Sequence, residues 1–487
     1  MVIIIYSAET DTSITSNLGR PEYSYYFVSK AFRTVLRRLA YVIETSRPEN
    51  DVDVIYEKCR SMGEACVFLS FSPPHGTVTG LKCPTISVFA WEFTTIPTDP
   101  FVGDDRYDWR NVFWQHGCAI THSSVAVRAI RKAMGSDFPV WSIPAPVWDD
   151  YVKLYKIDET SAQSNGVDLT FEGHLIDFNG CDAPSVPEEH RAGFIADRSL
   201  PKTDAPVKVH LDGIIYTTVF NPMDGRKNWQ DLVSGFISAF RNTDDATLVL
   251  KVVHYDFEEV RELVTDEVFK LVPFKCRVVI LHGYLNDREY AKLIQQSTYV
   301  VNTSHGEGQC LPLMESMSAG KPAISPVHTA LEDYIGETNS FVVRSSAERV
   351  WWPHDPRRAF RTTRYRINWE SLHAAYVESY QVAKNDSARY ARMSRSAVES
   401  LQKYCSRAIV EDRLKRVLRE RGIAAEDLLT ARRTTWRMAA RLMLEMWSVV
   451  LSRRVRSFKI AMTTRCLRSY AYAKSCFVWS KSPSAKS

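Results

Sequence analysis

Two glutamates, Glu307 and Glu315, are the residues best placed to do chemistry in this sequence. Glu307 falls in a loop after an apolar run at 299–302, and Glu315 falls about one turn into the helical segment that follows. The free N–H groups and the dipole at a helix N-terminus favour an anion such as a pyrophosphate. We expect both carboxylates to point into one pocket there and to accept hydrogen bonds from sugar hydroxyls, Glu307 nearer a hexose and Glu315 nearer a ribose.

Two adjacent cations, Arg226 and Lys227, supply the opposite charge. They follow an expected strand at 214–220 and open a helix, where they can clamp a diphosphate. Lys251 is a further candidate for the same charge, because a lysine inside a buried parallel strand, here 247–253, needs a partner.

The segment 304–324 resembles the E-x(7)-E signature of retaining GT-B glycosyltransferases of family 4, the glycosyl transferases group 1. The matching residues are Glu307, Gly308, Leu311, Pro312, Glu315, Met317, Gly320, Pro322 and Ile324. The sequence departs from the usual pattern at Gln309 and Cys310, where the family commonly has Phe and Gly. The resemblance implies a nucleoside-diphosphate sugar as donor substrate and neither a metal nor another cofactor.

The resemblance also places a set of residues around that donor. They are Gly19, Arg226, Lys227, Tyr284, Leu285, Gly308, Leu311 and Glu315, with Lys251 as the further candidate. Gly19 matches only part of the glycine-rich turn that approaches the donor phosphate in the family. Tyr284 and Leu285 stand in the turn that lies against the nucleobase.

Three residues are candidates for catalysis: Glu307, His75 and Glu92. His75 follows an expected strand at 66–71 and resembles the family's acceptor-domain histidine, although an ordinary exposed loop histidine fits the pattern nearly as well. Glu92 follows the strand at 85–90, where it meets an acceptor hydroxyl or caps the backbone amides of the threonines after it.

Strand and helix signals alternate in two blocks, which predicts an α/β fold with two doubly wound parallel sheets. The resemblance implies that these two Rossmann-like domains face each other, as in GT-B. The first block begins with an expected strand at 2–6, a helix at 23–45 and a strand at 52–55. The expected organisation is an acceptor domain at 1–150, a linker with a small hairpin at 151–210, a donor domain at 211–367, helices at 368–430 and a helical, basic tail at 431–487.

The tail differs from the body in charge, since it holds thirteen Arg and Lys residues against one acid, Glu445. Trp436, Met443 and Trp447 are spaced as on one face of a helix. This pattern favours an anionic membrane surface. Disorder or docking to a partner protein is the alternative, and we expect no nucleic-acid partner. The ten scattered cysteines form no C-x-x-C pair, which disfavours a zinc site or a disulfide framework.

Together these patterns predict a retaining hexosyltransferase that acts on a glycan or lipid-linked glycan in bacterial surface polysaccharide biosynthesis, of which lipopolysaccharide is one example. We expect it in the cytoplasm, peripheral at the inner face of the cell membrane. Two alternatives stay open: another enzyme on the same fold, such as a nucleotide-sugar epimerase or a phosphorylase, and a non-catalytic glycan-binding protein, which Gln309 and Cys310 motivate. The base of the donor, uracil or guanine, is also open.

Overall fold

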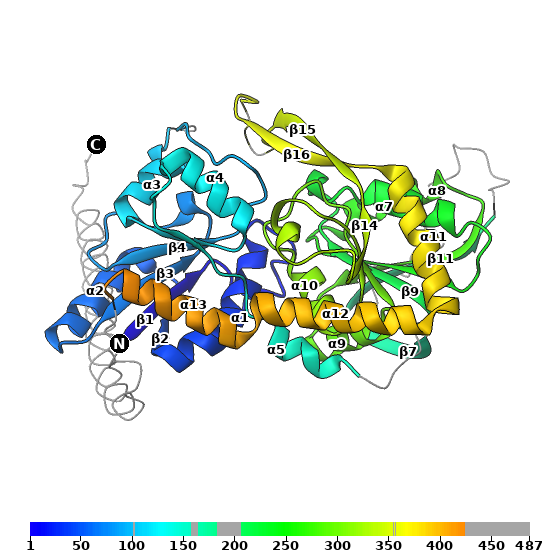
Figure 1. Ribbon diagram of the computed structural model, residues 1–487, viewed down its shortest axis with the longest axis horizontal. Coiled ribbons are helices and arrows are strands. Elements are labelled where there is room, and N and C mark those ends of the chain that lie inside the picture. Colours follow the sequence, from blue (N-terminus) through cyan, green and yellow to red (C-terminus); the bar gives the residue numbers. More distant parts are fainter. Residues whose placement is uncertain (101–102, 157–163, 183–205, 354, 356, 424–487) are drawn as a thin grey trace, which may run out of the picture. The chain divides into compact units, whose positions relative to one another are not determined.

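The computed structural model describes residues 1–487 except 101–102, 157–163, 183–205, 354, 356 and 424–487 (Figure 1). The tail expected at 431–487 lies outside the described residues, so its helix and its membrane contact stay predictions. None of the helices among the described residues is long and apolar enough to cross a membrane.

The first domain contains a six-stranded parallel sheet with the order β2-β1-β3-β4-β5-β6. Its strands are β1 (Val2–Ser7), β2 (Tyr41–Glu44), β3 (Cys66–Phe71), β4 (Thr85–Phe89), β5 (Ala119–Thr121) and β6 (Val140–Ser142). The helices between and after them are α1 (Tyr23–Leu39), α2 (Pro48–Ser61), α3 (Trp109–His116), α4 (Ser124–Met134) and α5 (Trp148–Tyr151). All residues of β3 and β4 are buried, as expected for central strands covered on both faces.

Two elements at the start of this domain differ from the sequence prediction. The helix expected over 23–45 ends at Leu39, and β2 follows it. The strand expected at 52–55 was wrong, because these residues lie inside α2. Its buried residues Val52, Ile55 and Cys59 recur at the spacing of a helix, and a window of four residues is too short to show that period.

The second domain contains an eight-stranded sheet with the order β14-β13-β12-β9-β10-β11-β8, in which β7 also pairs with β9. Its strands are β7 (Ser164–Phe171), β8 (Gly173–Cys181), β9 (Val207–Phe220), β10 (Ala246–Val252), β11 (Phe274–Gly283), β12 (Tyr299–Val301), β13 (Ala323–Pro326) and β14 (Ser340–Val343). Its helices are α7 (Trp229–Ala239), α8 (Phe257–Phe269), α9 (Asp287–Gln296) and α10 (Leu311–Ser318). The second alternating block of the sequence is thus a doubly wound sheet, as predicted.

The boundary expected at 211 needs correction, because the second sheet begins earlier. Strands β7 and β8 lie in the segment expected to be a linker, and both pair antiparallel with strands of the second domain, β8 with β11 and β7 with β9. An antiparallel strand commonly has one solvated face, so its apolar signal is weaker than that of a central parallel strand.

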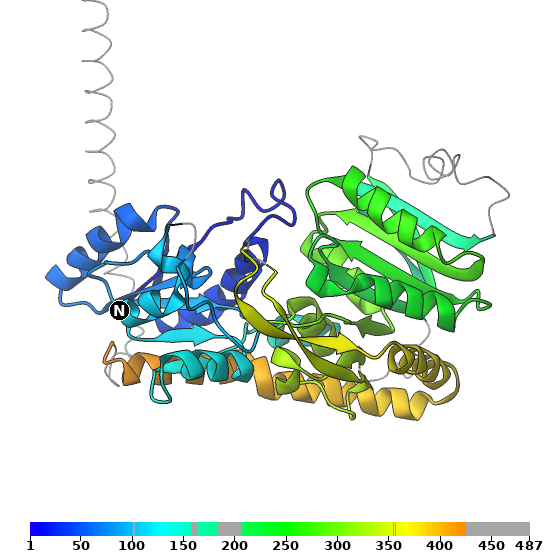
Figure 2. The same ribbon diagram turned by 90° about the horizontal axis from the view of Figure 1, so that it is seen from above.

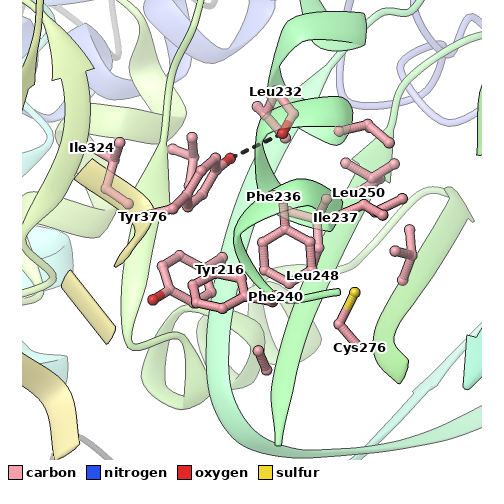
Figure 3. Close-up of a cluster of buried hydrophobic side chains, with 14 of the residues drawn as sticks. Tyr216, Leu232, Phe236, Ile237, Phe240, Leu248, Leu250, Cys276, Ile324 and Tyr376 are labelled. Atoms are coloured by element: carbon pink, nitrogen blue, oxygen red, sulfur yellow. Dashed lines mark hydrogen bonds between the residues drawn. The ribbon is translucent and has the colours of Figure 1, made fainter. Parts of the chain in front are cut away.

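Two cores cover the faces of the second sheet. On β9, Ile214 and Tyr216 enter one core and Ile215 enters the other, and all three are fully buried. Figure 3 shows the first core, where Tyr216 lies among Phe236 and other aromatic side chains. Burying one such side chain contributes about 1.5–3 kcal/mol, so these cores hold the sheet that positions the loops at its carboxyl edge.

A hairpin and three helices complete the described chain: β15 (Ser345–Trp351), β16 (Arg361–Ile367), α11 (Trp369–Asn385), α12 (Ser387–Cys405) and α13 (Arg407–Glu420). The hairpin is a separate two-stranded sheet, seen in yellow in Figures 1 and 2. Helix α13 packs against the first domain. Its residue Glu420 accepts a hydrogen bond of 2.9 Å from the indole of Trp141, and its residue Glu411 lies 3.5 Å from Arg38.

Candidate active site

The loop between β12 and α10 carries Glu307, whose side chain is 3% exposed. Its Oε1 atom accepts hydrogen bonds from Lys227 Nζ at 2.7 Å and Ser304 Oγ at 2.6 Å, and its Oε2 atom accepts one from Arg226 Nη1 at 2.9 Å. Burial raises the pKa of Glu307, but the charges of Lys227 and Arg226 outweigh it and hold this pKa well below its usual range. The carboxylate is therefore ionised and bound to both cations.

The two cations come from the 3-10 turn η5 (Gly225–Lys227), between β9 and α7. Asp224 begins this turn, and its side chain accepts a hydrogen bond from the backbone N–H of Arg226 and pairs with the Arg226 guanidinium at 2.8 Å. Arg226 Nη1 also donates to the backbone carbonyl of Gly306 at 2.8 Å. The charged side chains of Arg226 and Lys227 thus also fix turn η5 to the loop that carries Glu307.

Glu92, from the loop after β4 in the first domain, reaches the same cluster. Its Oε1 atom lies 3.7 Å from Arg226 Nη2. The structure therefore brings together four of the residues singled out from the sequence: Glu92, Arg226, Lys227 and Glu307. Three come from the second domain and one from the first.

Two glycines sit where the backbones of the domains meet. A Cβ atom on Gly19, which has a φ of +71°, would lie 2.4 Å from the carbonyl oxygen of Val253. A Cβ atom on Gly308 would lie 2.7 Å from Cβ of Ala90. These contacts join loops after β1 and β4 to loops after β10 and β12, so the carboxyl ends of the two sheets face each other. Both glycines were expected beside the donor, and in this structure each is required by a close approach between the domains.

Glu315 is a buried residue whose hydrogen-bond partners are tyrosines. It is 8% exposed, and its Oε2 atom accepts a hydrogen bond of 2.7 Å from the hydroxyl of Tyr290. Burial raises the pKa of Glu315 to about 7, against hydrogen bonds from Tyr290 and Tyr151 that lower it. A pocket shared with Glu307 stays a prediction; in the structure Glu315 contacts tyrosines and Glu307 contacts cations. Glu315 lies within helix α10, while Glu307 lies in the loop before it.

The residues that depart from the family pattern both have structural contacts. Cys310 adopts a left-handed conformation with φ 59°, and its Sγ atom accepts a hydrogen bond of 3.1 Å from Asn302. Gln309 is buried, and its side-chain oxygen accepts a hydrogen bond of 3.1 Å from the N–H of Ala145 in the first domain. Leu311 follows as the first residue of α10 and is buried.

His75 contacts aromatic side chains, and Lys251 contacts backbone carbonyl groups. Nδ1 of His75 accepts a hydrogen bond of 3.1 Å from the Trp109 indole, and its ring stacks on Tyr107. Burial and the nearby Arg106 lower the pKa of His75 to about 4. The Lys251 ammonium donates to the carbonyl oxygens of Gly283 at 2.6 Å and Val252 at 3.0 Å, and burial lowers its pKa to about 7.

The turn expected to contact a nucleobase places its two side chains differently. Leu285 is 7% exposed and belongs to a hydrophobic core of the second domain, so it is a packing residue in this structure. Tyr284 is half-buried, and burial raises its pKa.

Sequence reasoning missed three polar residues that hold Glu307. Asn302 Nδ2 lies 3.2 Å from Glu307 Oε1, Ser304 binds the same oxygen, and the Thr329 hydroxyl accepts from the Glu307 N–H at 2.9 Å. A signal for the first two was present, because polar residues directly after a buried parallel strand lie at the ligand-binding edge of a doubly wound sheet. Within the described part of the chain, no group of three or more His, Cys, Asp or Glu side chains has an arrangement that could hold a metal ion.

Residues 215–350 match the family model of the glycosyl transferases group 1. The match covers most of the second domain and the start of the hairpin that follows it. It contains Arg226, Lys227, Glu307 and Glu315, which the sequence pattern had singled out. With their facing sheets, the two domains form a GT-B fold. No curated protein sequence matches the chain.

Several solved structures resemble the chain at low identity. TarM of S. aureus, in complex with Fondaparinux, alpha-GlcNAc-glycerol and UDP, has a TM-score of 0.45 and 11% identity over 72% of this chain and 55% of TarM. HepE of Anabaena, in complex with UDP and glucose, has a TM-score of 0.49 and 12% identity over 86% of this chain and 100% of HepE. Sucrose-phosphate synthase from Thermosynechococcus elongatus has a TM-score of 0.48 and 13% identity over 87% of this chain and 100% of that enzyme. The chain thus spans little more than half of TarM.

Proposed function

We propose that this protein is a retaining glycosyltransferase that moves a hexose-type sugar from a nucleoside-diphosphate sugar to a glycan or a lipid-linked glycan. The observation that carries the proposal is the convergence of Arg226 and Lys227 on one ionised carboxylate, Glu307, inside the region that matches the glycosyl transferases group 1. A nucleoside diphosphate becomes a good leaving group when its charge is neutralised, and paired Arg and Lys side chains supply that neutralisation.

The residues of the cluster have complementary tasks in this reaction. Glu307 now neutralises the positive charges of Arg226 and Lys227. When the donor diphosphate binds these two cations, it neutralises them in place of Glu307. Glu307 can then accept hydrogen bonds from the hydroxyls of the transferred sugar. Glu92, from the acceptor side, is positioned to contact an acceptor hydroxyl near Arg226.

We propose that the anomeric configuration of the sugar is retained without a protein nucleophile, by the following transfer step. The bond between the anomeric carbon and the diphosphate oxygen breaks through an oxocarbenium-like state. The acceptor hydroxyl oxygen forms the new bond on the same face, and its proton passes to the departing diphosphate oxygen. In this front-face reaction the leaving group is also the base, so the cations serve both departure and deprotonation. We propose that no metal ion takes part.

The physiological setting remains part of the proposal. We place the enzyme in bacterial surface polysaccharide synthesis, with residues 431–487 holding it at the inner face of the membrane. The charge of that tail supports this placement. The rival function is a non-catalytic glycan-binding protein, which the occupation of both cations by Glu307 would suit.

A donor-hydrolysis panel tests the proposal. UDP- and GDP-hexoses are incubated in EDTA with the full chain, with Lys227→Met and with Lys82→Met, and the released sugar is measured. Lys82 is an exposed lysine that pairs with Glu57, which makes it a matched control for the lost charge. We expect slow hydrolysis of one donor, a loss of at least about tenfold in Lys227→Met, and no loss in Lys82→Met. Absence of hydrolysis with every donor would instead support the glycan-binding function.

A further inference from the structure

The hairpin of β15 and β16 is anchored beside the catalytic cluster, although it belongs to neither large sheet. The N–H of Tyr365 donates to the carbonyl of His305 at 2.8 Å, and the Tyr365 ring stacks on His328 with centroids 4.5 Å apart. His305 is two residues before Glu307. The base of the hairpin is therefore fixed to the loop that carries the catalytic carboxylate.

The other end of the hairpin reaches the acceptor domain. The hydroxyl of Thr95 donates to the carbonyl oxygen of Arg361 at 3.1 Å, and Arg357 pairs with Asp99 at 2.7 Å. The rings of Trp91 and Trp352 lie 5.7 Å apart. Trp91 is the neighbour of Glu92, so the hairpin connects the donor-side loop to the loop expected to meet the acceptor.

This hairpin carries a strong excess of positive charge. Residues 344–367 contain seven arginines and two acids, Glu348 and Asp355. Both acids are already paired, Glu348 with Arg364 at 2.9 Å and Asp355 with Arg357 at 3.0 Å. No carboxylate of the described chain lies within 4.0 Å of the guanidinium groups of the remaining five, which are all exposed: Arg344, Arg349, Arg358, Arg361 and Arg366.

One face of the hairpin combines these cations with an aromatic ring. Trp351 lies opposite Arg361, and Arg349 lies opposite Thr363, so all four side chains stand on the same face. Trp351 is 47% exposed, and the Arg361 guanidinium lies 4.3 Å from its ring centroid. An indole ring offers a plane for a sugar ring, and arginine binds carboxylate or phosphate in a forked geometry.

Resting on the transferase function above, we propose that this face of the hairpin binds the acceptor, and that the acceptor is an anionic glycan held by Arg349 and Arg361. Its anionic group is a carboxylate or a phosphate, which arginine recognises in the same way. A nucleic acid is disfavoured, because residues 1–430 hold 49 basic and 56 acidic residues and their net negative charge opposes a long polyanion outside this short face.

Binding measurements with the full chain test this assignment. The probes are labelled oligosaccharides of polymannuronate, of phosphomannan and of neutral dextran, together with labelled oligo-dT. The double variant Arg349→Gln/Arg361→Gln is compared with Arg37→Gln/Arg416→Gln, which removes the same charge from exposed positions on α1 and α13. Because both variants keep the basic tail, their difference reports the hairpin alone. A variant Arg349→Lys/Arg361→Lys that restores part of the affinity shows that the hairpin fold is intact.

We expect the hairpin variant to lose at least about tenfold in affinity for one of the two anionic glycans, with no more than a twofold loss in the control variant and no binding of dextran. The probe that loses more identifies the anion as carboxylate or phosphate. Equal affinities of the two double variants for both glycans would overturn the proposal, and so would a loss confined to oligo-dT. If the hairpin effect appears but the wild type hydrolyses no sugar donor, the transferase function fails and only the anion-binding surface stands.

Discussion

The Nζ atom of Lys227 lies 2.7 Å from Oε1 of Glu307, while Arg226 holds the other oxygen of the same carboxylate. The charge proposed to hold the donor diphosphate is thus balanced by a residue of the protein itself. On the proposed function, a donor diphosphate competes with Glu307 for these cations and releases the carboxylate for the sugar. The affinity for the nucleotide and the state of Glu307 are therefore linked.

A substitution at Gly19 tests whether activity depends on the close contact between the loop after β1 and Val253 of the second domain. Gly19→Ala places a Cβ atom 2.4 Å from the Val253 carbonyl oxygen, so the loop after β1 must move away from the second domain. Gly63 is a matched control, because it has the same φ of +71° and nothing within 4 Å of its Cβ position. Both variants should lose about 1 kcal/mol to left-handed strain, measured by urea unfolding. Only Gly19→Ala should also lose at least about tenfold in turnover; equal turnover in the two variants would refute the role of this contact.

Cys310 stands where the family commonly has glycine, and its φ of 59° shows the backbone conformation that glycine adopts without strain. We expect Cys310→Gly to stay within about 1 kcal/mol of the wild type, because relief of strain offsets the greater freedom of the unfolded chain. Cys310→Val should lose about 1–3 kcal/mol, since a branched side chain resists this conformation. Cys276→Val, in extended strand β11, is the control and should lose less. Calorimetry measures the loss of unfolding free energy in all three variants. If Cys310→Val loses no more than Cys276→Val, residue 310 does not have the left-handed backbone conformation.

Glu315 should make stability fall as the pH rises. Its pKa is about 7 in the folded protein and near 4.5 when unfolded, so the folded state binds more protons between these values. Unfolding free energy should therefore drop by about 2–3 kcal/mol between pH 4.5 and 7 from this group alone. Urea titrations of Glu315→Gln should lack that part of the decline. The same pH dependence in variant and wild type would show that Glu315 is ionised in the fold.

Lys251 should act with the opposite sign in a different pH window. Its pKa is about 7 folded and 10.5 unfolded, so the unfolded state binds more protons between these values and stability rises with pH. Lys251→Met should remove this rise, measured by urea unfolding at pH 7 and pH 9.5. A rise that persists in the variant would assign it to another group.

Much of the site followed from the sequence, because its residues stand in the turns after strands. The charge pair Arg226–Lys227 and the loop of Glu307 both lie at carboxyl ends of parallel strands, where the topology alone brings them to one edge. Contacts between distant segments gave no local signal. Neither the position of Gly19 against Val253 nor the path of the hairpin toward Asp99 could be read from patterns of spacing.

Leu285 and Lys251 have contacts that the sequence pattern did not show. The family resemblance placed Leu285 beside a nucleobase, and in the structure its apolar side chain is buried in a core of its own domain. Lys251 looked like a ligand for phosphate, yet two backbone carbonyl groups satisfy its ammonium group. The core around Leu285 and the Gly283 carbonyl that binds Lys251 are formed by residues from other strands, which spacing along the chain does not show.

The most direct test of the account is the thermal shift and affinity of UDP and GDP, measured with the wild type, Lys227→Met and Glu307→Gln. Glu307→Gln removes the carboxylate that pairs with Lys227 and leaves Arg226 with Asp224 and Glu92. The variant should therefore unfold at a lower temperature, and nucleotide should restore more stability to it than to the wild type. We expect one nucleotide to bind several-fold tighter to Glu307→Gln and at least about tenfold weaker to Lys227→Met. If neither nucleotide binds, or if all three proteins bind it equally, Arg226 and Lys227 are not the diphosphate site.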